Sequence, residues 1–328
     1  MRELRDLPKA HLHLHLEGAM RMSTLRELCR RSQIEVPVVS TSYGSFADFE
    51  DTYMAACDVL RSEGDLRRLV AEVVEDAAAD GAAWVEPAIY LPHHRQRIGP
   101  NELVIEAILD ELRRASAAHG IGAGLMVAAD RTLDPADAVA QAQLAVAYRD
   151  EGVVSFGLAN DEAAGPPEAF AEAFKIARGG GLISAPHAGE HRGPESVAGA
   201  LDALGANRIE HGVRAIEDPE LVKRLADSAV CLDVCPTSNV LLSVFPSLEA
   251  HSLPALLAAG VRCSINGDDP LLFGPNLLEE YELCRNRMGL DDDRLAFIAR
   301  CSLGASGAPA DLKARELDAV GRWLAGPG

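Results

Sequence analysis

Basic residues are scarce in this chain. Lys and Arg together number 31 against 50 Asp and Glu, and only four of them are lysines, so the formal net charge is −19 at pH 7. No run of basic residues is interleaved with aromatic ones. Because a surface of this sign repels phosphates, we expect neither nucleic acid nor an anionic membrane as a partner.

The chain also lacks long apolar runs and paired cysteine motifs. No stretch of about 18 apolar residues is present, and residues 1–6 lack the apolar segment of a signal peptide. Seven cysteines are scattered without a CxxC pair, which favours reduced thiols over a disulfide framework. We therefore expect a cytoplasmic protein with no membrane span.

No linker rich in Pro or Ser divides the chain, and apolar segments alternate between strand-like and helix-like spacing. Counting from Lys9, this gives eight predicted strands, each followed by a helix. No Gly-rich phosphate loop follows the first strand, which disfavours a dinucleotide-binding fold. The pattern predicts one (β/α)8 barrel domain over residues 1–328, with extra C-terminal helices. After the opening strand, the predicted strands are 82–89, 123–128, 153–158, 182–187, 208–211, 230–234 and 261–266.

A long helical excursion, residues 22–80, separates the first two predicted strands. An insertion of this size at one end of a strand is typical of a lid or a pocket wall. Phe46, Phe49 and Tyr53 recur at helical spacing, which fits either a pocket lining or plain core. We expect residues 46–60 to close over a substrate.

Three histidines alternate with leucines in the first predicted strand. His11, His13 and His15 point to one face, because residues two apart in a strand share a face. Neighbouring imidazoles on that face, roughly 7 Å apart along the chain, can converge on one metal ion. The alternative is an ordinary solvated strand face.

Other polar residues fall at the ends of later strands. His187 and Glu190 follow the fifth predicted strand, His211 ends the sixth, and Asp268 and Asp269 follow the eighth. In a barrel these ends share one face, where such folds place their active sites. Taken alone, the two aspartates before Pro270 would read as a helix N-cap.

His13, His15, His187 and Asp268 suit a single zinc ion with one position open for water. A second ion often needs a modified lysine on the fourth strand, and residues 153–158 contain none. His15 and Glu17 also match the H-x-E motif of cytidine-type deaminases, but the P-C-x-x-C partner motif is absent.

Five motifs, HLHLHLEG, HAGE, HGVR, VCPTSN and INGDDP, occur in this order along nearly the whole chain. Together they resemble the adenosine deaminase family of metal-dependent aminopurine hydrolases. The resemblance implies one zinc on the four ligands above. It also implies that Glu190 protonates the purine ring nitrogen, that His211 orients or deprotonates the water, and that Asp269 binds the imidazole side of the purine.

Several positions depart from the adenosine-specific pattern. His11 stands where Glu is usual, and we expect it to be structural. Glu17 replaces an Asp that often meets the ribose 5′-hydroxyl, and Glu210 precedes His211 where Gly is common; both resemble adenine-type relatives. Asn160 replaces a Gly whose backbone N–H meets the purine. The arginine usual after the second strand is also missing.

The first hypothesis is zinc-dependent hydrolysis of a 6-aminopurine nucleoside, adenosine or a close analogue, to its 6-oxo product and ammonia. Free adenine and 6-aminodeoxyfutalosine are the alternative substrates. A different metal-dependent amidohydrolase is a remoter possibility, as is a non-catalytic metal-stabilised binding protein. The sequence predicts substrate contacts from Asp269, Glu17, Asn160, Phe46 and Phe49, and leaves the oligomeric state open.

Overall fold

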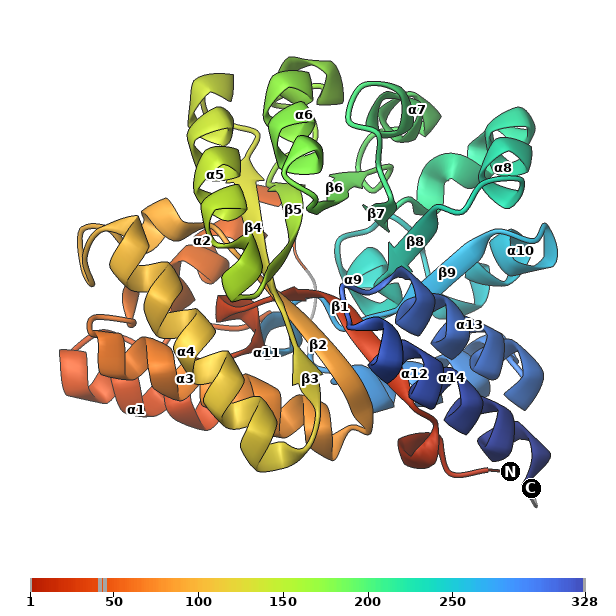
Figure 1. Cartoon of the computed structure of the whole chain (residues 1–328), viewed down its shortest axis with the longest axis horizontal. Coiled ribbons are helices and arrows are strands. Elements are labelled where there is room, and N and C mark those ends of the chain that lie inside the picture. Colours follow the sequence, from red (N-terminus) through yellow and green to blue (C-terminus); the bar gives the residue numbers. More distant parts are fainter. Residues whose placement is uncertain (1, 41–42, 44–45, 327–328) are drawn as a thin grey trace.

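The computed structural model describes residues 2–40, 43 and 46–326. Within them, eight parallel strands follow one another around a nearly closed barrel in chain order, as Figure 1 shows. This arrangement confirms the predicted (β/α)8 barrel. The strands are β1 (Lys9–His15), β2 (Ala82–Ile89), β4 (Leu125–Asp130), β5 (Val153–Ala159), β6 (Ile183–Ala188), β7 (Arg208–His211), β8 (Cys231–Val234) and β9 (Arg262–Ile265).

Helices surround the strands on the outside of the barrel (Figure 1). The segment between β1 and β2 contains α1 (Met22–Ser32), α2 (Phe46–Asp58) and α3 (Glu63–Ala79). The later helices are α4 (Asn101–His119), α5 (Pro135–Ala147), α6 (Ala171–Gly179), α7 (Pro194–Asp202), α8 (Pro219–Ala226), α9 (Pro236–Leu241), α10 (Leu253–Ala258), α11 (Pro270–Phe273), α12 (Leu277–Met288), α13 (Asp292–Ala305) and α14 (Ala310–Ala325).

The barrel closes between its last and first strands through residues that follow β9. The backbone N–H of His15 donates to the carbonyl of Asp268 at 3.0 Å, and the N–H of Asp268 donates to the carbonyl of His13 at 3.1 Å. The side chain of Asn266 accepts from the N–H groups of Leu12 and His13. These bonds fix Asp268 beside the two histidines.

A buried ion network fills the barrel interior beneath the strand ends. Arg208 lies 2.7 Å from Glu86 and 3.1 Å from Asp233, and all three side chains are fully buried. Ser264 donates to the second oxygen of Asp233 at 2.7 Å. Because each charge is paired, the network holds β2, β7, β8 and β9 together without leaving an unpaired buried ion.

The predicted strand positions are close to those observed, with one shift. The third major strand, β4, begins and ends two residues later than predicted, because residues 122–123 form the separate short strand β3 (Gly122–Ala123) against β2. The short helices α9 and α11 were not predicted. All seven cysteines are free thiols, as expected. Among the described residues, no helix is both long and apolar enough to cross a bilayer.

Candidate active site

A cavity opens at the carboxyl ends of the strands, where the sequence predicts the site. Its inner end is lined by His15, His187, Glu190, His211, Asp268 and Asp269. Helix α2 covers it with one face, which carries Phe46, Phe49, Glu50, Tyr53 and Met54. The cavity therefore joins residues from β1, β6, β7 and the loop after β9 to the segment between β1 and β2.

His13 and His187 turn one ring nitrogen each toward the other. His13 Nδ1 donates to the carbonyl of Asp233 at 3.0 Å, so a neutral His13 has its lone pair on Nε2. His187 Nδ1 lies 2.7 Å from Glu210, so a neutral His187 also has its lone pair on Nε2. The two Nε2 atoms are 3.2 Å apart. Two facing lone pairs at this distance repel unless a cation lies between them.

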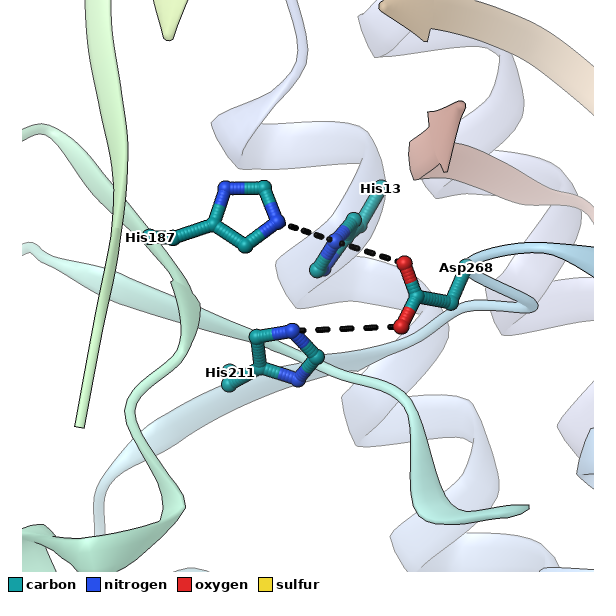
Figure 2. A group of neighbouring side chains, drawn as sticks. All are labelled: His13, His187, His211 and Asp268. Carbon is teal, nitrogen blue, oxygen red and sulfur yellow. Dashed lines mark hydrogen bonds and ion pairs between the residues drawn. The ribbon is translucent and has the colours of Figure 1, made fainter. Parts of the chain in front are cut away.

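The carboxylate of Asp268 completes this cluster, as Figure 2 shows. Its Oδ1 lies 3.2 Å from His13 Nε2 and 3.3 Å from His15 Nε2. Ligands at about 2.1 Å from a tetrahedral zinc ion are themselves about 3.4 Å apart, so these separations fit such an ion. Although burial opposes it, His13 and His15 hold the pKa of Asp268 well below its usual range, as a metal ligand requires.

His211 lies in the same cluster, and a relay fixes its tautomer. The N–H of Leu253 donates to His251 Nδ1 at 3.0 Å, so His251 Nε2 donates to the Asn239 side-chain oxygen at 3.1 Å. The Asn239 amide nitrogen then donates to His211 Nδ1 at 3.1 Å. Neutral His211 therefore carries its hydrogen on Nε2, which lies 3.4 Å from Glu190. Burial and the nearby His13 lower the pKa of His211 well below its usual value.

Three residues of the cavity have backbone conformations that side-chain-bearing residues rarely adopt. The φ angles of Asn160, His211 and Asp268 are 79°, 65° and 59°. Each follows or ends a barrel strand, where the left-handed turn directs its side chain into the cavity. Such strain is typical of functional sites.

The turn that carries Glu190 is held by the carboxylate of Glu162. The carboxylate of Glu162 accepts from the backbone N–H groups of residues 189, 190, 191 and 192, and from the hydroxyl of Ser196. Burial, with the charges of Asp268 and Glu162, raises the pKa of Glu190 well above its usual range. A protonated carboxyl group can give a proton to a ligand in the cavity.

Asp269 is buried with no hydrogen-bond partner for either carboxylate oxygen among the described residues. Burial and the adjacent Asp268 raise its pKa well above the usual value, which favours a protonated group able to donate. It precedes α11, but its side chain does not cap that helix. A Cβ on Gly18 would lie 1.7 Å from Asp269 Oδ1, so only glycine leaves room for this side chain.

Glu17 does not line the cavity. It is fully buried, and its two oxygens are occupied: His94 Nε2 lies 2.6 Å from one, and the hydroxyl of Tyr53 donates to the other at 2.8 Å. Tyr53 stands between Glu17 and the cavity, with its ring 6.1 Å from that of His15. His11, which was expected to be structural, accepts a hydrogen bond from the N–H of Gly267 at 3.0 Å.

The other predicted contact residues do reach the cavity. Phe49 stacks on Phe273 with ring centroids 5.3 Å apart, and Phe46 contacts His191. Both are thus pocket lining at its entrance, not plain core. Asn160 lines the rim after β5, where its side chain bridges Glu50 and Asp130.

Several residues of the site were not predicted. Glu50 lies one turn after Phe46 on the same helical face, and Asp130 ends a strand, so helical spacing and the strand-end rule could have found both. His94 ends the short 3-10 helix η3 (Leu91–His94), and the sequence gives no signal for its pairing with Glu17 because the two residues are far apart in the chain. Asn239 belongs to the motif VCPTSN, but its relay to His211 depends on tertiary structure.

A parallel (β/α)8 barrel with a buried cluster of histidines and aspartate at its strand ends is typical of the amidohydrolase class of hydrolases, and the cluster is a candidate metal site. The family model described as adenosine deaminase matches residues 8–323. The chain is 44% identical to a putative adenosine/adenine deaminase of Streptomyces virginiae, over 99% of each chain. It is 37% identical to the adenine deaminase of Cupriavidus necator, over 99% of this chain and 94% of that one.

Two solved structures have the same fold. The crystal structure of an adenine deaminase from Arthrobacter aurescens matches with a TM-score of 0.91 and 30% identity, over 97% of this chain and 99% of that one. An amidohydrolase from Burkholderia ambifaria with bound Zn matches with a TM-score of 0.87 and 29% identity, over 98% and 93%. The chain belongs to the adenosine deaminase family and is a hydrolytic aminohydrolase.

Proposed function

We propose that the protein is a zinc-dependent deaminase of free adenine, which it converts with water to hypoxanthine and ammonia. The nucleoside was the first hypothesis from the sequence, and free adenine an alternative. The names of the relatives, putative adenosine/adenine deaminase and adenine deaminase, support the alternative better. A small-molecule purine is then the partner of the site.

The position of Glu17 carries this proposal. In the adenosine-specific pattern this position meets the ribose 5′-hydroxyl, whereas here both carboxylate oxygens are engaged by His94 and Tyr53. The ring of Tyr53 also fills the space between Glu17 and the cavity. A nucleoside would bury its sugar hydroxyls at this end without the carboxylate partner, which is unfavourable.

We propose His13, His15, His187 and Asp268 as the residues that hold one zinc ion. The donor atoms of His13, His187 and Asp268 lie within 4.8 Å of one another, and His15 Nε2 lies 3.3 Å from Asp268 Oδ1. The bound Zn of the Burkholderia amidohydrolase supports the metal. His211 offers a hydrogen, not a lone pair, at Nε2, so it is better suited to orient the attacking water. When bound, zinc lowers the pKa of water enough to supply hydroxide near neutral pH.

Glu190 and Asp269 then bind the purine ring. Protonated Glu190 gives its proton to N1 while the water oxygen adds to C6, which prevents negative charge from accumulating on the ring. Asp269, with two unpartnered oxygens facing the cavity, donates to N7. The amino group then takes the proton of the hydroxyl group added at C6, the C6–N bond breaks, and ammonia leaves while C6 keeps a carbonyl oxygen.

Ammonia release by the zinc-loaded protein tests this function. The substrates are adenine, adenosine, AMP and 6-aminodeoxyfutalosine at equal concentration. We expect kcat/KM for adenine to exceed the others by at least about 100-fold. Preference for adenosine would overturn the choice of substrate, and no release from any of the four would overturn the aminopurine assignment.

The remaining expectations from the sequence stay predictions: a single domain over 1–328, an insertion at 22–80 that closes over the substrate, one zinc per chain, no nucleic-acid partner and a cytoplasmic location.

A further inference from the structure

A second polar group lies in the cavity on the side away from Asp268. It consists of Glu50 on α2, Asp130 at the end of β4 and Asn160 after β5, and all three line the cavity. In the strand order, β5 is opposite β9, the strand that precedes Asp268 and Asp269. This group therefore faces the part of a ligand that Asp269 does not reach.

Asn160 joins the two carboxylates. Its side-chain nitrogen donates to Glu50 Oε1 at 3.0 Å and to Asp130 Oδ2 at 3.2 Å, while its oxygen accepts from the N–H of Asp161. The other Asp130 oxygen accepts from the N–H and the hydroxyl of Thr132. Asp130 and Asn160 are thus anchored. Within the described residues, Glu50 Oε2 is the oxygen of this group without a hydrogen-bond partner.

The order of strands around the barrel assigns this group to one edge of the purine. With N1 at Glu190 after β6 and N7 at Asp269 after β9, the ring atoms C2, N3, N9 and C8 follow the strand ends β5, β4, β2 and β1. N3 and N9 then face the ends of β5, β4 and β2, where Asn160 and Asp130 lie and where α2 places Glu50 beside Asn160.

We propose that Glu50 determines the specificity for the free base by accepting the hydrogen bond of N9–H. Asp130 and Asn160 act as positioning residues that hold its carboxylate in place. This inference rests on the proposed adenine deaminase function and names the group that distinguishes base from nucleoside. In a nucleoside N9 carries carbon instead of hydrogen, so the carboxylate loses its partner; in a nucleotide, two carboxylates also repel the phosphate.

The test uses an adenine analogue in which a ring oxygen replaces N9–H, so that the donor is lost without added bulk. We expect the wild-type zinc-loaded protein to have a kcat/KM about 10- to 100-fold lower for the analogue than for adenine. In E50Q the amide can donate to the ring oxygen, so this preference should shrink to less than about threefold or reverse.

The control is D51N, which removes a charge from the adjacent exposed position of the same helix and should keep the wild-type preference. Equal turnover of adenine and the analogue by the wild type would overturn the role of Glu50 and leave the proposed function intact. That comparison requires no variant, so it tests the role of Glu50 even if E50Q misfolds. A preference unchanged in folded E50Q would also overturn it. Failure of the wild type to deaminate adenine would overturn both.

Discussion

The carboxylate of Glu162 accepts a hydrogen bond from the backbone N–H of Glu190 at 2.9 Å. It accepts three more from the neighbouring N–H groups of residues 189, 191 and 192. Beneath it, buried Arg131 donates to the carbonyls of Gly165 and His187. One carboxylate thus fixes the turn that presents Glu190 to the cavity.

We expect E162Q to lower kcat for adenine by about 10- to 100-fold while KM changes little. The amide nitrogen would face backbone donors, so one or two bonds are lost and Glu190 moves; the free energy of unfolding should fall by about 1–3 kcal/mol. Steady-state kinetics and urea unfolding measure both effects. The matched control is E172Q on the exposed face of α6. A wild-type kcat for E162Q would show that Glu162 does not position Glu190.

Gly18 leaves room for Asp269, and we expect G18A to displace that side chain. The added Cβ would lie 1.7 Å from Asp269 Oδ1. Because a misplaced contact group can cost about 100-fold in rate, we expect kcat/KM for adenine to fall by about that factor. The control is G304A, where an added Cβ meets nothing within 4 Å. If both variants keep full activity, Asp269 has no part in binding the purine.

The hydroxyl of Tyr53 ties α2 to Glu17, and we expect Y53F to loosen that helix. A bond to a carboxylate contributes about 1.5–3 kcal/mol, so residues 46–58 should become more sensitive to proteolysis and KM for adenine should rise. Y148F removes an exposed hydroxyl that bonds to Glu106 and serves as the control. Equal proteolysis rates for the two variants would contradict this link.

Glu280 should make stability depend on pH. It is buried, and burial raises its pKa from 4.5 to about 8; its Oε2 has no partner, as suits a protonated group. The folded state thus binds the proton more tightly than the unfolded state. The resulting stabilisation is fully present below pH 4.5 and is lost as pH rises through 8. At about 1.4 kcal/mol per pH unit it amounts to at most about 5 kcal/mol.

E280Q removes that titration while its amide oxygen can still accept from the N–H of Thr237. Relative to the wild type, E280Q should therefore be more stable at pH 8 than at pH 5. Urea unfolding of both proteins at the two pH values measures the difference. Parallel stability curves across this range would show that Glu280 titrates normally in the fold.

Site residues that lie at the ends of barrel strands could be predicted from the sequence. Contacts between side chains that are far apart in the sequence could not. Alternating histidines in β1 and polar residues after β6, β7 and β9 are visible in the sequence, because barrel topology brings those ends together. Glu17 was predicted to contact the substrate, and its engagement by His94 and Tyr53 instead depends on how η3 (Leu91–His94) and α2 pack.

The short helices show the same limit. Six residues in α9 carry too little periodicity to predict a helix, yet α9 places Asn239 against His211. The aspartate pair before Pro270 does precede a helix, α11. The carboxylate oxygens of Asp269 have no hydrogen-bond partner among the described residues, which shows that this side chain does not cap the helix.

The most direct measurement of the whole account is the turnover of adenine by E190Q, with the zinc content of each preparation measured in parallel. Gln has nearly the same shape as Glu but cannot give a proton to N1. We expect E190Q to hold one zinc per chain, unfold like the wild type, and release ammonia at least about 1,000-fold more slowly. Turnover within tenfold of the wild type at equal zinc content would contradict deamination by proton transfer from Glu190.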